Sequence, residues 1–262
     1  MTQSDSVPPI DLSRFACFFD VDGCLAAIET RPDWVSIPEN VRLALCQLYL
    51  LTGGALALVS GRTLNELDAL SAPLHSPAAG VHGAVRRDAQ GHIHQIDLPP
   101  SLAATLGQEL REAIAPFTGC HVEAKGMAFA LHYREAAHHK ADIEAVAAAF
   151  SARYPELTRQ PGKCVVELKP AGVNKGAAIE AFMTEAPFSG RTPLFIGDDV
   201  TDEAGFNAVN DLGGVSIKVG PGETAAGYRL DDVGQVHAWL LSLLEQKENH
   251  TMNTNNSVRE GL

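Results

Sequence analysis

Short apolar runs that end abruptly in polar residues alternate with segments of helical periodicity in the first part of the chain. Residues 15–19 (FACFF) stop at Asp-Val-Asp-Gly, and residues 55–59 (ALALV) stop at Ser-Gly-Arg. Between the two runs, Val41, Leu45 and Leu48 recur at the spacing of one helix face. Apolar runs of this length are typical of strands that are buried on both faces of a parallel sheet. The pattern therefore predicts alternating strands and helices.

The same rhythm returns in the last part of the chain. We predict a helix that begins near Lys175, strands over residues 193–197 and 215–219, and helices over residues 201–210 and 233–246. Strand and helix in alternation predict an open parallel sheet with helices on both faces.

The middle of the chain follows a different pattern. Residues 127–134 and 163–169 alternate with the period of two expected for half-buried strands, and residues 85–96 have the pattern of a hairpin. Helices are predicted over residues 101–116 and 139–153. Antiparallel strands with helices on one side predict an α+β subdomain.

These patterns together predict an α/β fold with two parts. Residues 1–98 and 172–246 form a doubly wound parallel-sheet (Rossmann-like) core, and residues 99–171 form an inserted α+β cap that determines substrate specificity. The polar residues 247–262 are predicted to be a disordered tail.

Composition and charge narrow the classes of function. The 262 residues include 32 acidic and 20 basic side chains, a formal net charge of −12. Nucleic acids and anionic membranes bind clustered Lys and Arg, so neither is an expected partner. Five cysteines without a CxxC pair give no disulfide framework or zinc site.

The expected location of the protein follows from the lack of a signal peptide and of a membrane-spanning segment in its sequence. Its first residues lack the basic and apolar regions of a signal peptide. The most apolar stretch, residues 43–59, is shorter than the ~20 residues that a membrane-spanning helix needs. We therefore expect a cytoplasmic monomer that acts on a small molecule.

Candidate chemical groups lie where predicted strands end or predicted helices begin. Ligands of open α/β sheets bind at the carboxyl ends of the strands, so groups far apart in sequence should meet there. The candidates are Asp20, Asp22, Ser60, Lys175, Asp198, Asp199 and Asp202.

These residue types suit hydrolysis of a phosphate ester. Mg²⁺ prefers hard oxygen ligands, which Asp20 and Asp198 would supply. Lys175 would place a positive charge on the phosphoryl oxygens, while Ser60 and backbone N–H groups of residues 21–23 would donate hydrogen bonds to them.

Two carboxylates of the first motif would carry the covalent chemistry. Asp20 can attack phosphorus and form an aspartyl-phosphate. Asp22 points in a different direction, so it can protonate the leaving alkoxide and then activate water.

The order DxDG, SGR, NKG and GDDxxD resembles the haloacid-dehalogenase-type phosphatase superfamily, with a cap between the second and third motifs. Residues 79–84, 123–134 and 162–170 further resemble the bacterial trehalose-6-phosphate phosphatase family. The resemblance covers the chain from about residue 15 to 245. It implies a Mg²⁺-dependent phosphoric-monoester hydrolase that converts trehalose 6-phosphate to trehalose in the last step of trehalose biosynthesis.

The resemblance also implies roles for individual residues. Asp20 is the nucleophile, Asp22 is the acid/base, and Ser60 and Lys175 bind phosphate. The implied metal ligands are Asp20, Asp22 through its backbone carbonyl, Asp198 and Asp199, with Asp202 close behind. The implied cap residues that bind sugar hydroxyls are Glu123, Lys125 and Glu167.

One residue departs from the family pattern. The family usually has DxDGT, and Cys24 stands here in place of the threonine. A thiol is a much weaker hydrogen-bond donor than a hydroxyl. We therefore expect the fold and metal site to survive, with lowered activity or sensitivity to thiol oxidation.

Several alternatives remain open at this level. Asp202 could simply cap the helix that it precedes, and Arg62 and His82 could line the cleft. Another sugar-phosphate phosphatase or a phosphosugar mutase would use the same scaffold. A response-regulator receiver also combines acids, a hydroxyl and a lysine around Mg²⁺, but its phosphorylated aspartate and acidic pair lie on different strands and it has no inserted cap.

Overall fold

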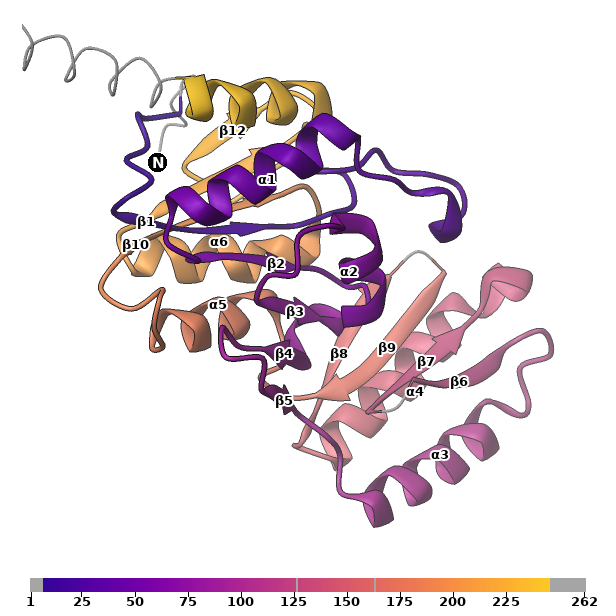
Figure 1. Cartoon of the computed structure of the whole chain (residues 1–262). Coiled ribbons are helices and arrows are strands. Elements are labelled where there is room, and N and C mark those ends of the chain that lie inside the picture. The colour runs from indigo at the N-terminus through magenta and orange to yellow at the C-terminus, as the bar shows by residue number, and fades with distance from the viewer. Residues whose placement is uncertain (1–6, 126, 163, 246–262) are drawn as a thin grey trace, which may run out of the picture. The chain divides into compact units, whose positions relative to one another are not determined.

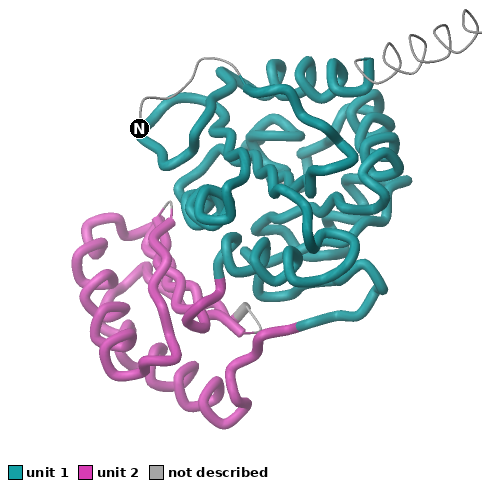
Figure 2. Tube along the Cα trace, turned by 90° about the vertical axis from the view of Figure 1, so that its left-hand side faces the viewer, with its two compact units in different colours: residues 1–94, 174–262 teal, residues 95–173 magenta. Residues whose placement is uncertain are grey.

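The computed structural model describes residues 7–125, 127–162 and 164–245. The chain divides into two compact units, which Figure 2 shows in different colours. Unit 1, the core unit, contains Met1–His94 and Asn174–Leu262, and unit 2, the cap unit, contains Gln95–Val173. The predicted disordered tail lies outside the described residues.

A mixed sheet organises the core unit. Its strand order is β12-β11-β10-β1-β2-β3-β4-β5. The pairs from β12 to β3 are parallel, and β4 runs antiparallel to β3. The strands are β1 (Phe15–Phe19), β2 (Leu56–Val59), β3 (Ala78–Gly80), β4 (Val85–Arg87), β5 (Ile93–Gln95), β10 (Thr192–Gly197), β11 (Val215–Val219) and β12 (Tyr228–Leu230).

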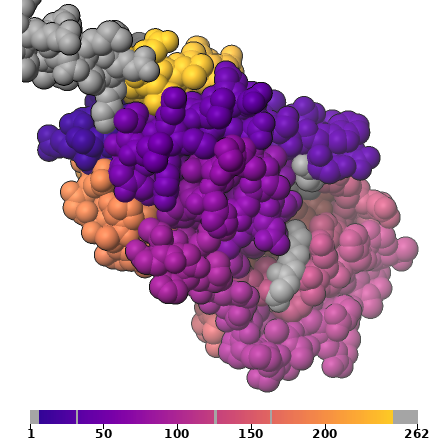
Figure 3. All heavy atoms as spheres, viewed as in Figure 1, coloured from indigo at the N-terminus to yellow at the C-terminus, as the bar shows by residue number. Residues whose placement is uncertain are grey.

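Helices cover both faces of this sheet because side chains of each strand point alternately to the two faces. Phe19 lies in one hydrophobic cluster with residues of α1 and of a helix over residues 233–245, whereas Phe18 lies in the other with residues of α5 and α6. The helices are α1 (Glu39–Leu51), α2 (Leu64–Ser71), α5 (Lys175–Met183) and α6 (Glu203–Asp211). Figure 1 shows this layering, and Figure 3 shows the same view with all heavy atoms, in which indigo to violet side chains of the first part of the chain gather over the core unit.

The cap unit contains an antiparallel sheet of order β6-β7-β9-β8. Two helices, α3 (Pro100–Ile114) and α4 (Lys140–Arg153), contribute Leu106, Leu110 and Ile143 to a core with Phe129 and Leu131. The strands are β6 (His121–Lys125), β7 (Ala128–His132), β8 (Leu157–Gly162) and β9 (Val165–Pro170).

The two faces of the cap sheet differ in chemistry. Register pairs Glu123 with Ala130, Ala130 with Glu167, and Glu167 with Gln160, so these four residues share one face. Leu131 belongs to the opposite face, which packs on the helices. The cap sheet therefore presents a polar face and an apolar face.

The structure confirms the predicted α/β class with a parallel sheet. Strand β8 was not predicted, because its sequence (LTRQPG) is mostly polar and includes Pro161 and Gly162. The short strands β3 and β12 were also not predicted.

Among the described residues, no helix combines the length and apolar character needed to cross a membrane. The described part of the chain also contains four short 3-10 helices: η1 (Pro32–Trp34), η2 (Val81–Gly83), η3 (Arg134–His139) and η4 (Val200–Asp202).

Two neighbouring residues of β7 test the division of the cap sheet into two faces. Leu131 is fully buried, and His132 is partly exposed beside Glu123. We expect Leu131→Ala to lower the free energy of unfolding by about 2–5 kcal/mol because it leaves a core cavity. His132→Ala should lower it by no more than about 1 kcal/mol, the contribution of one hydrogen bond. Urea unfolding of both variants measures the difference, and equal losses would contradict the assignment of faces.

Candidate active site

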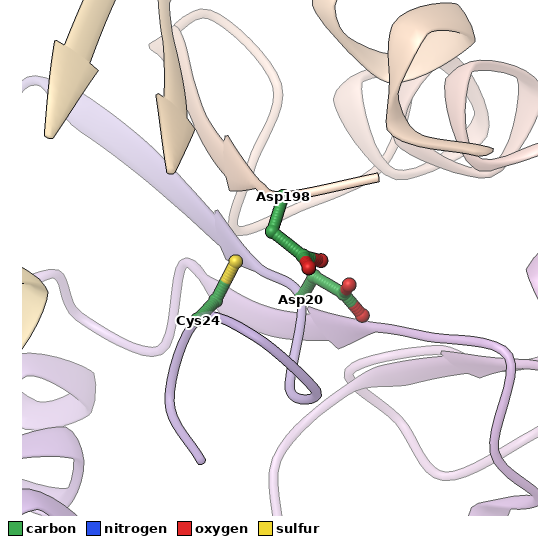
Figure 4. Close-up of side chains that lie close together, drawn as sticks. All are labelled: Asp20, Cys24 and Asp198. Carbon is green, nitrogen blue, oxygen red and sulfur yellow. The ribbon is translucent and has the colours of Figure 1, made fainter. Parts of the chain in front are cut away.

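Two carboxylates meet where adjacent parallel strands end. Asp20 follows β1 and Asp198 follows β10, and the backbone N–H of Asp20 donates to the carbonyl of Ile196 at 3.0 Å. One side-chain oxygen of each aspartate and the Sγ of Cys24 lie within 4.8 Å of one another. Figure 4 shows the three side chains side by side. The carboxyl ends of β1 and β10 therefore bring together one carboxylate of the first motif and one of the last motif.

Lys175 joins this group from the first turn of α5. Its side chain is 2 % exposed, and its Nζ lies 3.0 Å from Asp20 Oδ2 and 2.6 Å from Asp202 Oδ1. Asn174 caps the helix, because its side chain accepts a hydrogen bond from the Ala177 N–H at 2.9 Å. The cap and the two ion pairs hold the ammonium group in place.

Asp202 organises the segment that carries Asp198. It is fully buried, and its Oδ2 accepts hydrogen bonds from the backbone N–H groups of Asp198 and Asp199, both at 2.9 Å. Its carboxylate packs against Gly197, where an added Cβ would lie 2.3 Å from Asp202 Cγ. As the residue before α6, Asp202 makes no side-chain cap bond to that helix, but with Asp199 it forms a capping box at the start of η4, so the alternative that it caps a helix holds for η4.

Burial and the excess of carboxylates shift the pKa values of this group. Burial raises the pKa of Asp20 to about 7, against the opposing charge of Lys175. Burial and then Asp202 raise the pKa of Asp198 to about 6. Burial alone would lower the pKa of Lys175, but the carboxylates of Asp20 and Asp202 outweigh it and raise that pKa. Lys175 therefore stays protonated.

Ser60 lies at the carboxyl end of β2, next to β1 in the sheet. Its carbonyl accepts the N–H of His82 at 2.9 Å, and the carbonyl of Arg62 accepts the N–H of Val81 at 2.9 Å. Val81 and His82 have φ of 50° and 56°, a left-handed conformation that costs energy for residues other than glycine. The next residue, Gly83, abuts the carbonyl of Asn174. This strained loop links the phosphate-binding candidates Ser60 and Lys175.

Asp22 and Asp199 point to other partners. Both oxygens of Asp22 accept from Arg62, Nε to Oδ2 at 2.7 Å and Nη2 to Oδ1 at 2.6 Å. Asp199 is exposed, and its Oδ1 accepts the N–H of Val200 at 2.7 Å. Neither carboxylate belongs to the group of Asp20 and Asp198. The Asp22–Arg62 pair could not be predicted because their side chains come from different loops.

The turn after β1 uses the backbone N–H of Gly23, which we expected to donate a hydrogen bond to a phosphoryl oxygen. The N–H of Gly23 donates to the carbonyl of Ala26 at 2.8 Å. The prediction that the amides of residues 21–23 bind phosphate is therefore wrong for Gly23, because its N–H already closes the turn.

The predicted sugar-binding residues lie in the cap unit. Glu123 and Glu167 share the polar face of the sheet, and Glu123 Oε2 lies 2.9 Å from His132 Nε2. Lys125 belongs to β6, but its side chain lies outside the described residues. The same face includes Lys169, which donates to Gln160 and which no motif of the sequence indicated.

Gly23 offers a test of the close packing at the site. Its φ is +78°, and an added Cβ would lie 2.0 Å from Asp198 Oδ2. Gly91 has a similar φ of +85° but nothing within 4 Å, so it is a matched control. We expect Gly91→Ala to cost about 1–2 kcal/mol of unfolding free energy from backbone conformation. Gly23→Ala should lower the free energy of unfolding clearly more, and it should displace the Asp198 side chain. Chemical unfolding measures the first effect, and a crystal structure of the variant shows the second. Equal losses of unfolding free energy in the two variants would contradict the close contact.

Comparisons with known proteins agree with this geometry. The profile of the trehalose-phosphatase family matches residues 18–234. The chain is 48 % identical to the trehalose-6-phosphate phosphatase of Escherichia coli K12 over 254 residues, which cover 95 % of this chain and 96 % of that protein.

Solved structures share the fold. A trehalose-6-phosphate phosphatase related protein has a TM-score of 0.68 and 25 % identity, covering 89 % of this chain and 99 % of that one. The C-terminal domain of Candida albicans trehalose-6-phosphate phosphatase has a TM-score of 0.72 at 21 % identity, covering 88 % and 92 %. From the profile match and the identity over nearly its whole length, the chain belongs to the trehalose-phosphatase family.

Proposed function

We propose that the protein is a Mg²⁺-dependent phosphatase that hydrolyses trehalose 6-phosphate to trehalose and phosphate. The observation that carries this proposal is the meeting of Asp20, Asp198 and Lys175 at the carboxyl ends of adjacent strands. The substrate comes from the E. coli relative, whose name states that activity. A phosphate monoester needs both an anionic nucleophile and cations to neutralise its charge.

The residues of the site fit Mg²⁺. Asp20 and Asp198 offer hard carboxylate oxygens close together, and with Asp202 they exceed the single positive charge of Lys175. The backbone carbonyl of Asp22 is the third protein ligand that we propose. Cys24 offers a soft sulfur donor, which Mg²⁺ does not prefer. When bound, Mg²⁺ would offset the negative charge of the phosphoryl oxygens.

In the first step, a carboxylate oxygen of Asp20 attacks phosphorus while the bond from phosphorus to the sugar O6 breaks. Asp22 donates a proton to O6, so trehalose leaves as the alcohol. Lys175, held by Asp20 and Asp202, binds a phosphoryl oxygen, and the Ser60 hydroxyl donates to another. The product of this step is an aspartyl-phosphate on Asp20.

In the second step, water attacks the phosphorus of the aspartyl-phosphate. Asp22 accepts a proton from this water, and the bond between phosphorus and the Asp20 oxygen breaks. Phosphate leaves and Asp20 returns to its carboxylate form. Each turnover restores both aspartates.

The cap supplies the sugar contacts in this proposal. Glu123 and Glu167 share one polar face, where carboxylates can accept hydrogen bonds from sugar hydroxyls. We propose that Lys125 donates to the same sugar. A cytoplasmic location, a monomeric state and the absence of nucleic-acid or membrane partners stay predictions.

Phosphate release from three esters tests the function. We expect strong preference for trehalose 6-phosphate over glucose 6-phosphate and sucrose 6-phosphate, and loss of activity with EDTA or in Asp20→Asn. Removal of a nucleophile that acts with its partners typically costs several orders of magnitude in kcat. Asp33→Asn is the control, because Asp33 is exposed beside Arg31 and should leave activity unchanged. Equal turnover of the three esters would contradict the role of the cap, and transfer of phosphate between sugars instead of hydrolysis would indicate a mutase.

Cys24 offers a second test of the same site. The thiol is fully buried, and burial followed by the nearby carboxylates raises its pKa well above the ordinary value. A buried, protonated thiol resists oxidation, so the structure does not support sensitivity to peroxide. We expect unchanged activity after peroxide treatment. Cys24→Ser should raise kcat several-fold by adding a hydroxyl donor, which contributes about 0.5–1.5 kcal/mol.

The matched variant Cys24→Ala removes the thiol without adding a donor, so it should not raise kcat. If serine and alanine change kcat alike, the weak thiol donor does not limit the rate. Loss of activity in peroxide that both variants prevent would contradict the burial argument.

A further inference from the structure

The salt bridge between Arg62 and Asp22 joins the second motif to the first. Nε and Nη2 of Arg62 donate to the two oxygens of Asp22, at 2.7 and 2.6 Å. This two-point contact fixes both the position and the plane of the carboxylate. The side chain of Asp22 is 37 % exposed, so little else at the surface would restrict its rotation.

Arg62 is itself held firmly. Its side chain is 11 % exposed, and its Nη1 lies 3.7 Å from Glu66 Oε1. Glu66 belongs to a capping box at the start of α2, in which its Oε2 accepts the N–H of Thr63 at 2.9 Å. The backbone N–H of Arg62 faces Ser60 Oγ at 3.4 Å. The guanidinium therefore lies between Asp22 and the first turn of α2.

This contact constrains how Asp22 can transfer protons. Both of its oxygens accept from Arg62 in this structure, and each oxygen keeps a second lone pair that can carry a proton to the substrate or take one from water. The two contacts would hold the carboxylate in one orientation during these transfers. Proton transfer falls off steeply with misplacement of the catalytic group, so this orientation affects the rate.

We propose that Arg62 is a positioning residue for both proton transfers of Asp22. The inference rests on the proposed function and adds a residue to it. In the first step, the Asp22 proton moves to the sugar O6 as the P–O6 bond breaks; in the second, a water proton moves to Asp22 as the bond between phosphorus and Asp20 breaks. Attack of Asp20 on phosphorus does not involve Arg62.

A comparison of leaving groups separates these steps. The sugar alkoxide of trehalose 6-phosphate needs a proton to leave, whereas p-nitrophenolate leaves without one. Rapid-mixing measurements with p-nitrophenyl phosphate give the first-turnover burst, which reports attack by Asp20, and the later steady rate, which reports hydrolysis of the aspartyl-phosphate. Both substrates are measured with the wild-type chain and with Arg62→Gln, Arg62→Lys and the control Arg153→Gln. Arg153 is an exposed partner of Glu109 in the cap unit.

For Arg62→Gln we expect kcat for trehalose 6-phosphate to fall about 10- to 100-fold, part of the 10²–10⁴ that general acid–base catalysis contributes. The burst rate with p-nitrophenyl phosphate should stay within about threefold of wild type, because the acid is not needed there. The later steady rate should fall, and KM should change little. Arg62→Lys keeps the charge but offers a single-point contact. Its kcat for trehalose 6-phosphate should therefore lie between those of the wild-type chain and Arg62→Gln.

Two results would overturn the proposal. One is a burst rate that falls as much as kcat for trehalose 6-phosphate, which would place Arg62 in phosphate binding or in the fold. The other is an unchanged kcat. If Arg62→Gln does not fold, Arg62→Lys provides the same test, in which the fall in its burst rate is compared with the fall in its kcat for trehalose 6-phosphate. If the wild-type chain does not hydrolyse trehalose 6-phosphate, the proposed function fails, while the ratio of burst to steady rate with p-nitrophenyl phosphate still tests Arg62.

Discussion

The buried ion pairs of Lys175 with Asp20 and Asp202 are the constraint on which the site depends. They tie together the end of β1, the start of α5 and the turn η4, three segments that are far apart in sequence. Removal of one partner from a buried pair leaves an uncompensated charge and typically costs about 3–5 kcal/mol. The same contacts therefore stabilise the fold and place Asp20, the nucleophile of the proposed function, beside a permanent positive charge.

The site carries more negative than positive charge, and this excess gives it its chemistry. Burial, and after it the charge of Asp202, raises the pKa values of Asp20 and Asp198 even with Lys175 nearby, so the ionised forms of both carboxylates are disfavoured. A divalent cation and Lys175 would together offset this repulsion and attract a phosphate group.

The core unit and the cap unit hold different kinds of polar groups. The core unit holds the groups that react in the proposed function. The two carboxylates of the first motif face different partners: Asp20 faces Lys175, and Asp22 faces Arg62. The cap unit holds a polar sheet face with Glu123 and Glu167 in register. In the proposed function, the core unit carries the chemistry and the polar face of the cap recognises the sugar, a division that would let one scaffold serve different esters.

The sequence by itself determined the α/β class, the strand-end position of Asp20 and Asp198, and the helix start at Lys175, because hydrophobic periodicity and strand polarity are local properties. It did not indicate strand β8, whose polar residues pair only because β9 lies beside them. Tertiary structure alone decided that Asp202 binds Lys175 and that Asp22 pairs with Arg62. Each of these contacts joins groups whose partners are chosen by packing, and spacing along the chain does not encode that choice.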